Sequence, residues 1–160
     1  ILGRGEQLGL ADGTLDLILS VDVIHHVSDK ASFFREAARS LCSDGRLCTV
    51  TDSEETICRR EVLSGHFPET VQSELARYPS VAQLEAWIAA AGLECLGVVI
   101  VQERYEITSS QPFRYKAYTA LHLIPESAWR AGLARLESDL QSGPVVGSSR
   151  SACVWSRKPE

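Results

Sequence analysis

Residues 11–29, ADGTLDLILSVDVIHHVSD, decide the fold. Their centre, residues 15–21, is a nearly continuous apolar run, which is typical of a strand buried on both faces of a parallel sheet. Residues 11–14 form the turn before this strand, and Ser28 or Asp29 can cap a helix after it. The stretch therefore predicts a strand, a loop that contains two adjacent histidines, and a helix, in that order.

The helix that follows has apolar residues at the spacing of one helix face: Phe34, Ala37, Ala38 and Leu41. We expect Ser43-Asp44-Gly45 to end this helix, and residues 46–51 to form a second strand. Strand, helix, tight turn and strand together make a right-handed crossover unit of the α/β class. The sheet is therefore predicted to be at least partly parallel.

The rest of the chain alternates irregular segments with regular elements. Residues 53–79 are predicted to be a connector with one short helix, and residues 106–125 a second irregular segment. The regular elements expected around them are a helix from Ser80 to the turn at Gly92, a strand over 96–101 that runs on toward Tyr105, a helix from about Pro125 to before Gly143, and a last strand over 152–156. We expect residues 1–160 to form a single domain.

Composition excludes several classes of protein. The 160 residues carry 16 Lys and Arg against 21 Asp and Glu, a formal net charge of −5, without a basic cluster. Nucleic acid is therefore disfavoured as a partner, because nothing would neutralise its phosphates. No apolar stretch approaches the ~18 residues that a membrane-spanning helix needs. A small-molecule substrate or a protein partner remains.

Five cysteines lie far apart, and none forms a C-x-x-C pair. Zinc sites use thiolates at short spacing, so we expect no metal and interpret these residues as small buried hydrophobic side chains. An odd number of cysteines without a secretory leader indicates a reducing cytoplasm.

Gly5-Glu6-Gln7-Leu8, taken together with residues 11–29, carries a resemblance to a known family. It resembles the class I S-adenosylmethionine-dependent methyltransferases, in particular a small-molecule (methyltransferase type 11-like) branch that reads roughly A-E-x-L-P-x-x-D-x-S-F-D-x-V and then V-x-H-H-x-x-D. The resemblance implies an α/β, Rossmann-like fold with a mostly parallel sheet and an antiparallel terminal strand. It also implies S-adenosylmethionine as cofactor and methyl transfer to a small-molecule acceptor.

The same resemblance implies which residues meet the cofactor. In the family, the positions of Gly5 and Glu6 approach the adenine ring, and backbone groups near Ser20 and Val21 approach the methionine part. Ligands of such sheets lie at the carboxyl ends of the strands, which agrees with this placement. Arg4 stands where many members carry an acidic residue.

Two histidines are candidates for the chemistry. His25 and His26 follow the strand, and a histidine suits a general base that takes a proton from the acceptor. Because consecutive side chains rarely face the same way, we expect one to be functional and the other structural, and we favour His25. Asp22 fits a pocket carboxylate and a solvated loop charge equally well. Aromatic residues of the irregular segments suit either a lid or anchors to the core: Phe67, Tyr78, Phe113, Tyr115 and Tyr118.

The family's glycine-rich turn and its ribose-binding acidic residue have no counterpart in these residues. We therefore expect this chain to be the carboxy-terminal portion of a truncated methyltransferase, inactive alone. Without the missing strands, the strand over residues 16–20 has an unpaired edge, which predicts either marginal stability or a homodimer. The alternative function is a non-catalytic interaction module that retains the second half of the fold.

Overall fold

The computed structural model describes residues 3–160, which divide into two compact units. The first unit contains residues up to 53, residues 78–101 and residues 151–160. The second contains residues 54–77 and 102–150. The expectation of a single domain stays a prediction, and each unit is described separately below.

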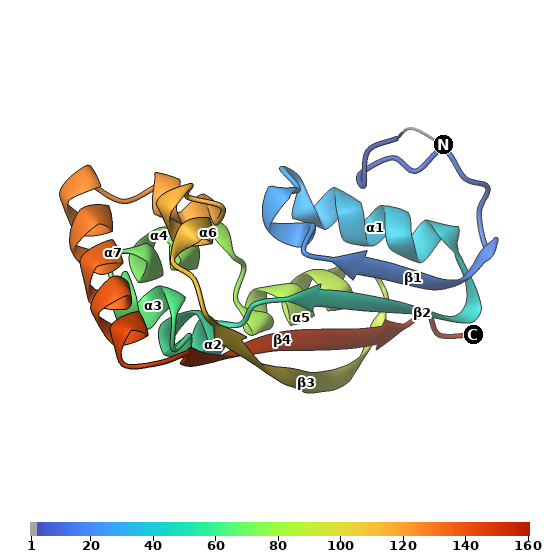
Figure 1. Cartoon of the computed structure of the whole chain (residues 1–160). Helices are drawn as coiled ribbons and strands as arrows, with labels where there is room; N and C mark the ends of the chain where they lie inside the picture. The colour runs from blue at the N-terminus through green and yellow to red at the C-terminus, as the bar shows by residue number, and fades with distance from the viewer. Residues whose placement is uncertain (1–2) are drawn as a thin grey trace. The chain divides into compact units, whose positions relative to one another are not determined.

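The first unit is built on a four-stranded sheet. Its strands are β1 (Leu15–Val21), β2 (Leu41–Thr51), β3 (Glu94–Ile107) and β4 (Val145–Arg157), and the last two continue into the second unit. The spatial order is β1-β2-β4-β3, with β2 parallel to β1 and antiparallel to β4 (Figure 1). The predicted α/β, Rossmann-like fold with an antiparallel terminal strand is therefore confirmed. The sheet is mixed and not wholly parallel.

One boundary differs from the prediction. The helix α1 (Lys30–Ser40) ends earlier than expected, and Ser43-Asp44-Gly45 belongs to β2. The strand is irregular there, because the β1–β2 register shifts between Leu15 and Leu17 and Asp44 has a φ of 62°. A Cβ on Gly45 would lie 2.9 Å from two backbone oxygens, so only glycine fits this close approach.

Two helices of the first unit, α1 and α5, begin at residues that the sequence predicts as helix caps. Asp29 accepts a hydrogen bond from the Ser32 backbone N–H at 2.9 Å and begins α1. Ser80 and Gln83 form a reciprocal capping box at the start of α5 (Val81–Ala90). Gly92, with a φ of 77°, ends that helix as predicted.

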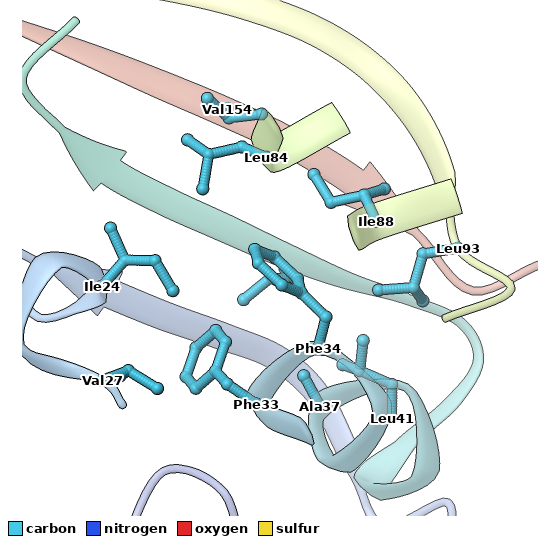
Figure 2. Packing of buried hydrophobic residues seen from close by; sticks show 11 residues of the cluster. Ile24, Val27, Phe33, Phe34, Ala37, Leu41, Leu84, Ile88, Leu93 and Val154 are labelled. Carbon is cyan, nitrogen blue, oxygen red and sulfur yellow. The ribbon is translucent and has the colours of Figure 1, made fainter. Parts of the chain in front are cut away.

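Helices α1 and α5 bury one face of the sheet. Figure 2 shows Phe34 of α1 with Leu84 and Ile88 of α5 in this core, all of them fully buried. The cluster also contains Ile24, Val27, Phe33, Ala37, Leu41, Leu47, Leu93 and Val154. Burial of apolar area at roughly 25 cal/mol per Å² makes this layer the main source of stability in the unit.

The opposite face of the sheet is open along β1, although Cys48, the neighbour of Leu19 on β2, is buried. This face carries the side chains of Leu17, Leu19 and Val21, which alternate along β1 with more buried side chains of the other face. Leu19 is 60% exposed. The prediction that β1 is buried on both faces is therefore wrong for residues 3–160, because the helices cover one face only. Farther along the sheet, a shallow groove of about 320 Å³ is lined by Arg46, Leu96, Gly97, Val98, Val99 and Trp155.

The second unit is mainly helical. The predicted connector over 53–79 contains α2 (Glu54–Arg59), α3 (Leu63–His66) and α4 (Thr70–Arg77). The segment over 106–125 contains α6 (Gln111–Arg114) and the 3₁₀ helix η2 (Thr119–His122), and α7 (Glu126–Gln141) follows. The expectation of irregular connectors there is corrected, because these short helices surround a core of their own: Val62, Phe67, Phe113, Leu121, Ile124, Leu133 and Leu136.

The helices over residues 3–160 are all too short or too polar to cross a membrane.

The open face predicts self-association of this chain. We expect concentration-dependent dimers in sedimentation velocity, because an edge strand beside exposed Leu17, Leu19 and Val21 favours pairing with a second copy. Leu19→Lys should shift the chain toward monomer with little loss of stability, since Leu19 is exposed. Ala86→Lys, on the exposed side of α5, is the matched control and should leave the dimers unchanged. A wild-type chain that stays monomeric at every concentration contradicts this prediction.

Candidate functional site

The candidate site lies in the first unit, where β1 ends and the chain turns away from the sheet. Asp22 takes up a left-handed backbone conformation, with a φ of 52°, and its N–H donates to the Val50 carbonyl of β2 at 3.0 Å. The 3₁₀ helix η1 (Ile24–His26) follows and is fixed by Ile24, which is fully buried in the core. The chain that leads into the two histidines is therefore anchored at Asp22 and at Ile24.

His25 lies between two aromatic rings. Its imidazole stacks on Tyr78 with ring centroids 4.0 Å apart and planes inclined by 27°. The ring of His26 lies 4.0 Å away, inclined by 47°. His25 is half-buried and His26 is exposed, so the two imidazoles differ in their access to solvent. The stack restricts the rotamers of His25, which suits a side chain that must be held toward a reactant.

Glu6 is connected to the same loop. Its Oε1 accepts a hydrogen bond from the Ser28 hydroxyl at 3.0 Å, and Arg4 Nε lies 3.7 Å from Oε2. The backbone N–H of Glu6 and the Ser28 hydroxyl lower the pKa of this carboxyl below its ordinary value. A lowered pKa keeps Glu6 ionised at neutral pH, and therefore able to accept a hydrogen bond from a ligand.

The segment that carries Gly5 and Glu6 is attached to α1. Glu36 accepts a hydrogen bond from the Leu8 backbone N–H at 2.8 Å, and Arg39 donates to the same carboxylate. The Arg39 guanidinium, followed by the Leu8 N–H, lowers the pKa of Glu36 to about 2. The resulting stabilisation is complete above the ordinary pKa of 4.5 and is lost as the pH falls toward about 2. Gly5 packs closely, because a Cβ there would lie 3.0 Å from the Phe33 ring.

Ser20 and Val21 end β1 on opposite faces. Ser20 is 6% exposed and belongs to the face covered by α1 and α5, in register with Thr49 of β2. Val21 is 54% exposed on the open face. The side chain of Ser20 is therefore turned into the unit, while Val21 is accessible to a ligand.

The second unit has a cleft of its own, whose charged groups are already engaged. It has a volume of about 580 Å³ and contains His66, Asp139, Arg135 and Glu61. His66 contacts the Val62 carbonyl and Asp139 at 2.9 and 3.0 Å, and Arg135 donates to the His66 carbonyl. Glu61 accepts from the backbone and hydroxyl of Ser148. These partners indicate a structural network that holds helices together.

Two of the five candidate lid aromatics are core anchors. Phe67 and Phe113 are buried in the second unit and stack with centroids 5.7 Å apart. Tyr118 contacts Phe113 at 5.1 Å, and Tyr115 is 74% exposed. Tyr78 differs from these four, because it belongs to the first unit and packs against His25.

Comparison with known proteins gives a family match over the first part of the chain. The family model described as a methyltransferase domain matches residues 1–49, which include Gly5, Glu6, Ser20, Val21 and His25. The search among curated proteins found no match.

Solved structures share the fold at low sequence identity. A protein from Bacillus halodurans C-125 assigned as a methyltransferase is 16% identical with a TM-score of 0.61, and the match covers 99% of this chain and 76% of that chain. The YcgJ protein of Bacillus subtilis is 19% identical with a TM-score of 0.55, covering 99% and 70%. Geranyl diphosphate C-methyltransferase of Streptomyces coelicolor A3(2), solved with Mg²⁺, geranyl diphosphate and S-adenosyl-L-homocysteine, is 14% identical with a TM-score of 0.53, covering 99% and 51%.

The resemblance to class I S-adenosylmethionine-dependent methyltransferases is thereby confirmed, in sequence over residues 1–49 and in fold over nearly the whole chain.

Two contacts of the site were missed by sequence reasoning. Ser28 was considered only as a helix cap, yet it binds Glu6. Tyr78 is predicted as a candidate lid residue, yet it stacks on His25, which is 53 positions away in the sequence, a pairing that no local pattern reveals.

The stack predicts a spectroscopic signature at His25. In carbon–proton correlation spectra, the ring current of Tyr78 should displace the imidazole C–H signals of His25 upfield. Tyr78→Leu removes that ring, so these signals should move downfield and broaden, whereas Tyr78→Phe should leave them near the wild-type position. His122, in the second unit, is the internal control and should not move in either variant. Identical His25 signals in the wild type and Tyr78→Leu would refute the stack.

Proposed function

We propose that this chain takes part in S-adenosylmethionine-dependent methyl transfer to a small-molecule acceptor, by in-line displacement. The observation that carries the proposal is the position of His25, held against Tyr78 in the loop that directly follows β1. The family match over the same residues supports it. We further propose that the full-length protein supplies the glycine-rich turn and the ribose-binding acid.

Residues at two places fit the cofactor. Glu6, kept ionised by its own backbone N–H and by Ser28, offers a carboxylate oxygen to an amino group such as that of adenine. Val21 is exposed at the end of β1, where its backbone can approach the methionine part. The close packing of Gly5 on Phe33 keeps this segment near the start of α1. S-adenosylmethionine, when bound, supplies an electrophilic methyl group.

His25 is proposed as the general base. Its imidazole accepts the proton that the acceptor's hydroxyl or acidic carbon loses as the new bond to carbon forms. The remaining task of the protein is alignment of the acceptor with the methyl group and exclusion of water, because a displacement at a sulfonium needs little covalent assistance. Tyr78 contributes by holding the imidazole in one orientation.

The open face of the sheet favours a second candidate function. A non-catalytic interaction module would use the exposed side chains of Leu17, Leu19 and Val21 to contact a protein. The two functions differ in one observable, because only the methyltransferase needs specific affinity for S-adenosylmethionine at Glu6 and Val21.

Cofactor binding by this chain should be weak. We expect calorimetry with S-adenosylmethionine to give a dissociation constant no tighter than about 1 mM, or about −4 kcal/mol, because the glycine-rich turn and the ribose-binding acid are not among its residues. A full-length protein that contains both elements should bind in the micromolar range. Micromolar binding by the 160-residue chain alone would show that those elements are not needed.

The two histidines should differ in the full-length enzyme. We expect His25→Ala to lower kcat by about 10²-fold or more, the usual contribution of a general base. His26→Ala is the matched control and should have a smaller effect, because its ring is exposed and lies outside the stack with Tyr78. The kcat of each variant is measured by the rate at which S-adenosylhomocysteine is released in the presence of acceptor. Equal and negligible effects would remove both histidines from the chemistry.

A further inference from the structure

Three hydroxyl side chains are buried together on the helix-covered face of the sheet. Ser20 of β1 is in register with Thr49 of β2, and Thr51 lies two residues beyond Thr49 on the same face. Their exposed fractions are 6%, 0% and 1%. The three hydroxyls therefore form one polar patch within an otherwise apolar layer.

None of these three hydroxyl oxygens has a hydrogen-bond partner among residues 3–160. Two buried hydroxyls in the second unit are satisfied, by contrast: Ser64 donates to the Ile57 carbonyl, and Thr70 to the Phe67 carbonyl, each at 2.6 Å. Burial of a hydroxyl without a partner is unfavourable, so a cluster of such groups is a place where a molecule outside the chain can complete the hydrogen bonds.

The patch lies at the functional end of the strands. β1 and β2 are parallel, so the carboxyl ends of both strands point the same way, which is where ligands bind in open α/β sheets. Ser20 immediately precedes Val21 and the loop that holds His25. Ser156 also has an unpartnered buried hydroxyl, but it is in register with Leu47, away from these ends.

The chemistry of the patch selects a neutral ligand. Each hydroxyl can both donate and accept, and the residues in register with them on β4 are Val154 and Ala152, which are apolar. Val154 and Ala152 offer no charge to a buried ion, and burial of a charged group beside apolar side chains is strongly unfavourable. A neutral oxygen, by contrast, can accept from one hydroxyl and, where it carries a hydrogen, donate to another.

We propose that Ser20, Thr49 and Thr51 form a subsite for a neutral oxygen. Water occupies it in the free protein, and the hydroxyl or carbonyl oxygen of the methyl acceptor takes that place on binding. The role for the acceptor rests on the proposed methyltransferase function, whereas the binding of a neutral oxygen does not. The subsite would then favour neutral, oxygen-bearing acceptors over charged ones.

Unfolding equilibria test whether the hydroxyls are satisfied. Thr49→Val keeps the shape of the side chain but removes its hydroxyl. If a bound oxygen completes the hydrogen bond, the unfolding constant should rise about fivefold. Ser156→Ala, in the same unit but in register with Leu47 rather than with a residue of the patch, is the control and should leave the constant unchanged or lower it. An unfolding constant that falls in Thr49→Val would overturn the proposal, and Thr51→Val repeats the test if the first variant does not fold.

Nuclear Overhauser measurements on the wild type identify the occupant, with isopropanol as the probe. Cross-peaks from water to the methyl groups of Thr49 and Thr51 should be present in the free protein. Isopropanol should replace them with cross-peaks of its own, which would support the role for an acceptor oxygen. Water peaks that persist in isopropanol would overturn that role while confirming a water-filled subsite. Absence of both kinds of peak would overturn the subsite itself. These readouts need no methyl transfer, so they are independent of the proposed activity.

Discussion

Parallel pairing between β1 and β2 is the constraint on which the candidate site depends. The pairing runs from Leu17 opposite Arg46 to Val21 opposite Val50, so the strands reach their carboxyl ends together. The core beneath it, centred on Phe34 of α1 and on α5, holds both strands from one side. The loop with His25 leaves from this shared end and is fixed by buried Ile24. Without the pairing, nothing would hold Ser20 and Thr49 next to each other or fix the start of the histidine loop beside them.

Local sequence patterns predicted the elements of the first unit well, because they depend on local physics. The apolar run over 15–21 gave β1 with the correct bounds, and Ser80 and Gly92 marked both ends of α5. Prediction failed where the structure is determined by contacts between residues that are far apart in the sequence. Gly45 looked like a helix stop, but it fits a close approach between β2 and the Leu15 carbonyl. One short helix was expected over 54–77, whereas the structure has three there, because the core beside them also requires residues of 102–150, which no local pattern connects to this segment.

Burial on a single face explains both the chemistry and the association behaviour of the sheet. Toward α1 and α5, the rung that joins Ile18 and Leu47 is apolar, and the next rung, Ser20 and Thr49, carries hydroxyls. Toward the open face, Leu19 and Val21 are exposed. The same strand therefore offers polar groups inside the unit and an apolar surface outside it. For the site, this means that Val21 is reached from the open side, whereas Ser20 faces the helices.

Residue-resolved amide chemical shifts during titration with S-adenosylhomocysteine test the central claim most directly. The account predicts that millimolar ligand shifts Gly5, Glu6, Ser20 and Val21, even though saturation is not reached. Amides at Ser156 and in the second-unit cleft near Ala134 should stay unchanged. Shifts confined to that cleft, or none anywhere at the same concentration, would contradict the assignment of the site to the carboxyl end of β1.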